Sequence, residues 1–500
     1  MAAIGTGLWC WHWHFAFRQF GGMDGSVLVN GAWQQYVGGV AYRDFLTGVP
    51  PFHLLLGGLA FKLLGPTWSA LTALAAVFSV LSFGAAVLLG SWCGLTFLEA
   101  TFLSLALQAT TTCLASWWWY NQVTSVIAAL CLLSCGAVLK NPDSVWRWCA
   151  HAAACAFLVL CKLNVAAPVF AGTLFVLLTC RWRRALGFTT AALAAVVAGL
   201  FSIGVDPIDI LHEYLRTSHR VLNTDNLLHF AVLNDPWEAV PAILLAIIIN
   251  GAGLLVCSQV ASPPGGKLRA WGTSLGVLLL GALTSTIGFL TNNDYNVGEL
   301  PPLLVGSWVL AATIRSSWIH DAFVRYHMRC LTGILVALTC CGLLIGFHRL
   351  RVVSTGEGRF ASYGAPLTRV EDGVFQGMFA IKRFHTTRQE LKEFLAGAGG
   401  AKAVDGRVFI GPRIDFAYAD LRLRSPRGLP LWWESVADDS PMVRRFLSIR
   451  FEYLVFLDIG DGTPDVTFLP GALQDDIRIH YRRIHAGAIV VFRRTDQKNG

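Results

Sequence analysis

The chain has 500 residues, of which 54% are hydrophobic and only 14% are charged, and its mean hydropathy is positive. No soluble domain of this length has such a composition, so a soluble globular protein is excluded and a polytopic α-helical membrane protein is predicted. The formal net charge is +8, but no basic tract is combined with an aromatic RNA platform. Nucleic-acid binding is therefore not expected.

The composition changes along the chain. From about residue 348 onward charged residues return and apolar runs become short. We therefore predict a transmembrane domain over residues 1–347 and a soluble α/β domain over residues 348–500. All 13 cysteines lie at or before Cys341, and no CxxC pair or Cys/His spacing suggests a structural metal. The cysteine-free tail needs no disulfide.

A helix that crosses the hydrocarbon needs about 20 mostly apolar residues. The runs that approach this length predict about eleven transmembrane helices. They lie near residues 3–20, 67–90, 95–116, 121–139, 146–161, 163–180, 185–205, 239–257, 271–290, 301–314 and 328–347. The first run begins almost at Met1, which leaves room for further native residues before it.

The long first loop, residues 21–66, contains two short segments that are not long enough to span. Residues 25–37 predict a surface helix, and residues 52–64, "FHLLLGGLAFKLL", predict an interfacial helix that ends at "GP". Lys and Arg are concentrated in one set of alternate loops, including "RWRR" at 181–184 and "KLR" at 267–269. That set is predicted to be cytoplasmic. The first loop and the C-terminal domain then face the exterior.

Two acids in the first loop are the candidate catalytic residues. Asp24 follows two glycines at the end of the first apolar run, and Asp44 lies in "YRDF" next to Arg43. A carboxylate at the membrane boundary can act as a general base on an incoming hydroxyl or amine. Nearby cations can bind a phosphate that leaves with a lipid. The alternatives are a solvated or helix-capping acid and, for Asp44, a structural pair with Arg43.

The stretch "MDGSVLVNGAWQQYVGGVAYRDFLTGVPPFHLLLGGLAFKLLGP" resembles the first external loop of the polytopic GT-C type glycosyltransferases. These include protein mannosyltransferases that use dolichyl-phosphate-mannose and bacterial aminoarabinose transferases that modify lipid A. The stretches "VLCKLNVAAPVF" at 159–170 and "TNNDYNVGELPPLLVG" at 291–306 are further similarities. The specific motifs cover about forty residues of the chain.

The resemblance implies a membrane glycosyltransferase that moves a sugar from a polyprenyl-phosphate donor to a lipid, glycan or protein acceptor, with inversion. It also implies a bacterial inner membrane location, with the active site and C-terminal domain in the periplasm. Asp24 matches the catalytic Asp of the family, but Gly25 stands where a Glu is usual. A second carboxylate role would then pass to Asp44. The superfamily includes members with and without a divalent cation, and no metal ligand is assigned here.

Substrate binding is assigned to outward-facing polar residues near the interface. Lys162 interrupts two apolar runs at a tight hairpin, where a cation either contacts phosphate or snorkels to the surface. Further candidates are Arg43, Lys62, His219, Arg220, Asp294 and Tyr295. The alternatives are snorkelling for Lys62, an exposed amphipathic helix face for His219 and Arg220, and a turn before Pro-Pro for Asp294 and Tyr295.

The tail contains apolar runs at 407–413, 453–460 and 488–494 that predict strands, and "TTRQELKEFLAG" at 386–397 predicts a helix with a Thr cap. The proposed role of this domain is to cover the active site or recruit the acceptor. A transporter or lipid flippase remains an alternative to the transferase, although mid-span charges and repeated halves are not evident. A scaffold protein is a third class, but it has no need of an acid beside in-plane helices.

Overall fold

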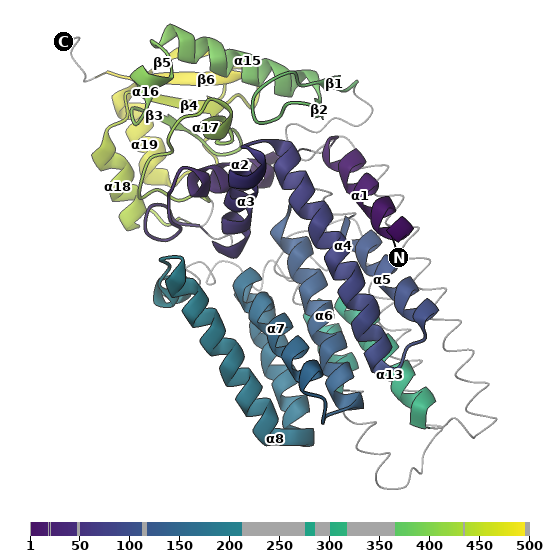
Figure 1. The fold of residues 1–500 in the computed structure, drawn as a ribbon. Coiled ribbons are helices and arrows are strands. Elements are labelled where there is room, and N and C mark those ends of the chain that lie inside the picture. The colour runs from purple at the N-terminus through teal and green to yellow at the C-terminus, as the bar shows by residue number, and fades with distance from the viewer. Residues whose placement is uncertain are drawn as a thin grey trace.

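A bundle of apolar helices is capped at one end by a small layer of strands and helices (Figure 1). The computed structural model describes residues 2–18, 20, 22–47, 51–112, 118–212, 276–285, 301–317, 366–433 and 436–495. The predicted spans 239–257 and 328–347, and the predicted domain boundary at 347/348, lie outside these residues.

The N-terminal segment forms α1 (Ala2–Ala16), followed by two short helices, α2 (Gly22–Tyr36) and α3 (Pro51–Leu64). In α1, His12 hydrogen-bonds the Ser79 hydroxyl at 2.6 Å and so fixes α1 against the next long helix. Helices α2 and α3 correspond to the two short segments predicted in the first loop. Helix α2 begins three residues earlier than predicted, so Asp24 lies in its first turn.

The bundle continues with α4 (Trp68–Cys93), α5 (Phe97–Thr112), α6 (Tyr120–Lys140) and α7 (Val145–Cys161). Helices α8 (Leu163–Ser202) and α13 (Pro301–Ser317) and the helical residues 276–285 complete its described part. Within the described residues, α4, α6 and α8 are long and apolar enough to cross a membrane. The number of eleven spans stays a prediction.

Helix α8 is interrupted where the sequence carries "RWRR". Arg181 has non-helical angles (φ −148°, ψ 72°), which separates the two apolar runs predicted at 163–180 and 185–205. Its guanidinium pairs with Asp143 at 3.0 Å, so the turn between α6 and α7 lies beside this kink. Two of the loops predicted to be cytoplasmic therefore meet at one end of the bundle, opposite Lys162.

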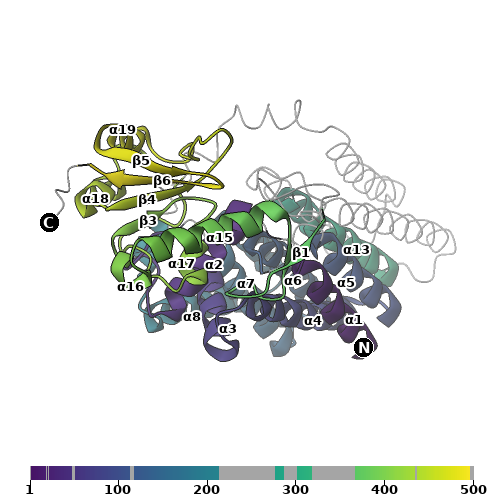
Figure 2. The same cartoon turned by 90° about the horizontal axis from the view of Figure 1, so that it is seen from above.

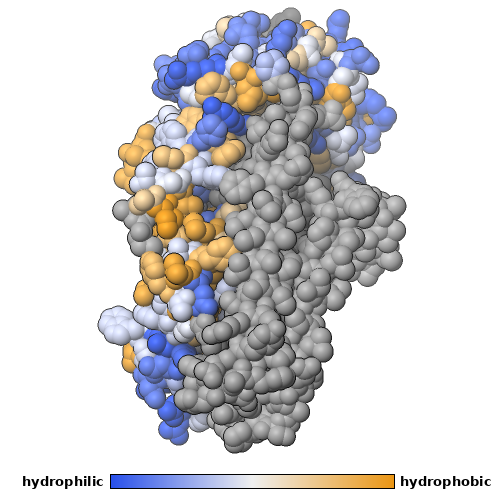
Figure 3. Space-filling model, turned by 90° about the vertical axis from the view of Figure 1, so that its right-hand side faces the viewer, coloured by the Kyte–Doolittle hydropathy of each residue, from blue (hydrophilic) through white to orange (hydrophobic). Residues whose placement is uncertain are grey.

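The outside of the bundle is apolar. Large hydrophobic side chains such as Leu81, Leu98, Trp146 and Phe175 are exposed there. In Figure 3 hydrophobic side chains gather on the middle of the coloured surface, between hydrophilic side chains above and below. Exposed apolar side chains in this arrangement are typical of helices that face lipid.

The C-terminal layer contains a four-stranded sheet in the order β3-β4-β6-β5, seen from above in Figure 2. Strands β3 (Val408–Ile410) and β4 (Tyr453–Leu457) pair in parallel, and β6 (Ile489–Arg494) pairs antiparallel with β4 and with β5 (Tyr481–Ala486). A separate pair joins β1 (Thr368–Arg369) to β2 (Phe379–Ala380). The helices are α15 (Lys382–Gly397), α16 (Ala401–Val404), α17 (Ala417–Asp420), α18 (Pro441–Ile449) and α19 (Gly471–His480).

The predicted Thr cap of the helix at 386–397 is wrong. Helix α15 begins at Lys382, and the Thr386 hydroxyl donates to the Lys382 carbonyl at 3.1 Å inside the helix. The helix has this extra turn because Phe384, which lies in it, is buried against the Phe20 ring.

The C-terminal layer shares a hydrophobic core with the first helices of the bundle. Phe20 contacts the rings of Trp68, Phe375, Phe384 and Phe416, with centroid distances of 5.1–5.9 Å. Aromatic side chains of this size dominate the burial energy of a core. The layer is therefore packed onto the bundle, and movement of one against the other would expose these rings.

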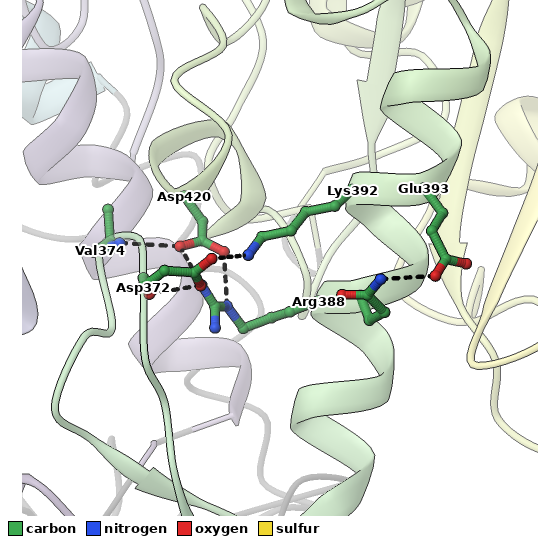
Figure 4. Close-up of polar contacts among 7 residues, drawn as sticks. Asp372, Val374, Arg388, Lys392, Glu393 and Asp420 are labelled. Carbon is green, nitrogen blue, oxygen red and sulfur yellow. Dashed lines mark hydrogen bonds and ion pairs between the residues drawn. The ribbon is translucent and has the colours of Figure 1, made fainter.

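A buried ion pair secures the same junction (Figure 4). The Arg388 Nε lies 2.7 Å from the Asp420 carboxylate, and both side chains are almost fully buried. Asp420 also accepts from the Val374 N–H at 3.0 Å, while the Val374 carbonyl accepts from the Trp68 N–H at 2.6 Å. Asp372 forms ion pairs with both Arg388 and Lys392. The start of α4 is thus linked through Val374 to the network on α15 and α17.

Candidate functional site

Asp24 lies near the start of α2, on a different face from the residues that hold the C-terminal layer. Asp24 is half-buried and lies in the first turn of the helix, where backbone N–H groups favour a negative charge. Ser26 is two positions further, which turns it by about 200° around the helix. Because Ser26 contacts the C-terminal layer, the packing of that layer determines the rotation of α2 and with it the direction of Asp24.

The contact between α2 and the C-terminal layer is centred on a buried carboxyl group that the sequence did not indicate. Asp415 accepts hydrogen bonds from the Ser26 hydroxyl and, at 3.2 Å, from the Asn30 amide. The Ser26 oxygen also accepts from the Phe416 N–H at 2.8 Å, and the Asn30 oxygen accepts from Ser425 at 2.7 Å. Burial raises the pKa of Asp415 to about 7, against the smaller lowering effect of the two side-chain hydrogen bonds.

Gly25 leaves little room for a side chain next to Phe20. A Cβ atom at position 25 would lie 3.3 Å from the Phe20 ring, which is closer than most such contacts. Phe20 is held there by the aromatic cluster at the junction. A glutamate at this position would therefore require the Phe20 ring to shift.

Asp44 and Arg43 form the structural pair that was one of the two alternatives for Asp44. Their charged groups lie 2.8 Å apart, and the Val40 N–H donates to the same Asp44 oxygen at 2.9 Å. Burial would raise the pKa of Asp44, but these hydrogen bonds and the charges of Arg43 and Arg427 lower it below its ordinary value. The carboxylate closes the turn at residues 40–44, while the Arg43 side chain is still 63% exposed.

Lys162 lies between α7 and α8 and points into the protein. Its Nζ donates to the Asn121 side-chain oxygen at 2.8 Å and lies 5.3 Å from the centre of the Tyr120 ring. This ammonium group is partly buried among polar partners, which is not the geometry of a snorkelling lysine. The cation is held in position at the end of the bundle opposite the "RWRR" turn.

His53 connects α3 to the segment that carries Tyr120. The His53 ring stacks on Trp118 with centroids 4.6 Å apart and contacts the edge of Tyr120 at 6.2 Å. Burial lowers the pKa of His53 to about 3, so the imidazole is neutral at physiological pH. In the sequence this histidine is only part of an apolar segment, and a lone His among leucines gives no signal of these contacts.

Lys62 and Asp24 are not brought together. Gly31 of α2 lies against Leu54 of α3, and Gly58 lies against Gln35, so the two helices run in the same direction. Asp24 is near the start of this pair and Lys62 is near its other end, roughly 20 Å away by the helical rise. Lys62 is exposed. The candidates His219, Arg220, Asp294 and Tyr295 lie outside the described residues.

No metal site can be built from the described part of the chain, because no group of three His, Cys, Asp or Glu side chains is arranged to hold an ion there. A role for a divalent cation therefore stays a prediction from the resemblance.

No family model matches the chain, and no curated protein matches it significantly. Among solved structures it is similar to ArnT from Cupriavidus metallidurans bound to undecaprenyl phosphate. The TM-score is 0.52 at 12% sequence identity, and the match covers 99% of this chain and 97% of that one.

The chain shares the fold of this ArnT structure. The match extends over both the helical bundle and the C-terminal layer, since it covers nearly the whole of each chain. The fold suggested by the first-loop motif is thereby confirmed.

Proposed function

We propose that this protein is an integral-membrane glycosyltransferase that uses a polyprenyl-phosphate sugar. The similarity to a GT-C structure that holds undecaprenyl phosphate, over almost the entire chain, is the observation that supports this most strongly. Residues 1–347 are the proposed catalytic membrane domain, and residues 348–500 are the proposed external domain. The acceptor is a lipid, a glycan or a protein.

In the proposed reaction Asp24 is the general base. Its carboxylate takes the proton from the acceptor hydroxyl or amine, whose oxygen or nitrogen then attacks the anomeric carbon of the sugar. The bond from that carbon to the phosphate oxygen breaks, and its electron pair leaves with the polyprenyl phosphate. Attack from the opposite face inverts the anomeric centre. The loop-charge pattern supports placing this site at the outer face of the membrane.

Lys162 is the proposed partner of the departing phosphate. A partly buried ammonium group can donate a charge-assisted hydrogen bond to a phosphate oxygen and stabilise the charge that develops there. Asn121 and Tyr120 orient it, and the neutral His53 ring supports Tyr120 from the α3 side. Asp44 and Arg43 are proposed to shape the turn beside the site.

The direct test is sugar transfer by the purified protein from a panel of polyprenyl-phosphate sugars to a membrane extract. We expect product from at least one donor of the panel. The absence of transfer with every donor would contradict the proposal and favour a transporter, which would instead move a labelled lipid across a sealed vesicle membrane.

Replacing Lys162 with Met is expected to raise the KM for the donor about tenfold, because one charge-assisted hydrogen bond to phosphate is lost. Lys162→Arg keeps the charge and should retain most of the affinity. Lys62→Met is the matched control, since Lys62 is exposed and far from Asp24. A donor KM that is the same in Lys162→Met and in the parent would exclude the phosphate role.

A further inference from the structure

A groove in the C-terminal layer is lined by three arginines from segments far apart in the sequence. Arg424 and Arg427 lie in the loop after α17, and Arg445 lies on α18. Together with Asp405 they line an open space of about 360 Å³. We call it the arginine groove. It is not part of the proposed transfer site, and the transfer mechanism does not use it.

The three guanidinium groups of the arginine groove are exposed, and no carboxylate of the described residues forms an ion pair with any of them. Asp405, the acid in the lining, accepts instead from the Arg424 backbone N–H at 2.9 Å. Asp44 lies near enough to Arg427 for this arginine to lower its pKa, but Asp44 forms its ion pair with Arg43. Like charges that are held together and outnumber their counter-charges repel each other, which makes such a groove attractive to anions. Among the residues that line the groove, three arginines therefore face one acid, Asp405.

The backbone holds the arginines in place. Gly428 has a φ of +77°, a conformation that favours glycine, and it turns the chain directly after Arg427. The Gly428 N–H donates to the Asp44 carbonyl at 2.7 Å, and the Leu431 N–H donates to the Leu46 carbonyl at 2.8 Å. The loop of the arginine groove is thus fastened to the first loop, next to the exposed Arg43.

We propose that the arginine groove binds a phosphate-bearing group. Guanidinium groups match the oxygens of phosphate in a bidentate manner, and three positive charges against one negative charge suit a dianionic phosphate better than a single carboxylate. The space is larger than a bare phosphate needs and is in the size range of small-ligand pockets. A phosphate on a lipid headgroup and a phosphate on a soluble molecule share this chemistry. The proposal goes beyond the transferase activity and does not depend on it.

The test measures binding to the purified full-length protein in phosphatidylcholine nanodiscs at low ionic strength. Inorganic pyrophosphate is the soluble probe, followed by calorimetry, and liposomes containing phosphatidic acid are the lipid probe, followed by co-flotation. We expect saturable binding that weakens tenfold or more in Arg427→Ala and in Arg445→Ala. Binding that declines as salt is added would agree with an ionic site.

Arg444→Ala is the matched control, because Arg444 is the exposed neighbour of Arg445 on α18 and does not line the groove. Loss of pyrophosphate binding in the groove variants alone supports a site for soluble phosphates. The same pattern with phosphatidic acid supports a lipid headgroup. The proposal is overturned if the parent binds neither probe saturably, or if Arg444→Ala weakens binding as much as Arg445→Ala does.

Discussion

Replacing Asp24 with Asn is expected to lower the rate of sugar transfer about a hundredfold or more, which is the scale for losing a general base. Asparagine has nearly the same shape as aspartate but cannot accept the proton of the acceptor. The loss should appear in kcat, because the donor lipid is bound by other groups. The measurement is initial-rate transfer from the best donor of the panel, with parent and variant at matched protein concentration.

Asp44→Asn is the comparison that separates the two acids. Asp44 closes the turn at residues 40–44 and pairs with Arg43, so its loss should alter the structure of the loop rather than remove a base. We expect a much smaller fall in kcat for Asp44→Asn than for Asp24→Asn. The reverse order would move the base to Asp44, and equal rates in the parent and Asp24→Asn would remove Asp24 from the chemistry.

The second large effect is a pH-dependent stability that originates at Asp415. The pKa of Asp415 is about 7 in the folded protein, whereas the ordinary value of 3.8 applies to the unfolded chain. The folded state therefore holds the proton more tightly than the unfolded state. Below pH 3.8 both states are protonated and there is no penalty. As the pH rises from 3.8 toward 7, the carboxyl group ionises in the unfolded state but stays protonated in the folded state. Ionisation lowers the free energy of the unfolded state relative to that of the folded state. The free energy of unfolding should therefore fall by about 4 kcal/mol over this window and then level off.

Asp415→Asn cannot ionise and should lack this decline, while Ser26→Ala should extend it to higher pH because a hydrogen bond that lowers the pKa is lost. The experiment compares urea unfolding of the detergent-solubilised proteins between pH 4 and pH 8, within the range where the parent refolds. Identical pH profiles for the parent and Asp415→Asn would show that this carboxyl group does not titrate as described.

The helices of the bundle could be predicted from the sequence alone. Long apolar runs such as those of α4 and α6 can satisfy their backbone hydrogen bonds in lipid only as helices. The two short helices of the first loop were also predictable, because their apolar segments are too short to span. Strands β4 and β6 were predictable from buried apolar runs. The first-loop motif was sufficient to indicate the fold that the ArnT structure shares.

Strand β5 was not predictable from its residues, "YRRIHA", most of which are exposed. It forms because β6 offers an unpaired edge next to it, and that pairing is a property of the folded sheet. The start of α15 was missed for a similar reason, since burial of Phe384 extends the helix beyond its local cap signal. In both cases tertiary contacts outweigh local propensity.

The contacts between polar groups could not be predicted from the sequence. Asp415 and Ser26 are separated by 389 positions, and no spacing in the sequence relates them. The arginines at 424, 427 and 445 become one groove only when α18 packs beside the loop after α17. Hydrophobic periodicity and local propensity can be read along the sequence, and they indicate which segments form the long helices and the buried strands. Contacts between distant segments depend on how the formed elements pack, and they position the charged groups on which function depends.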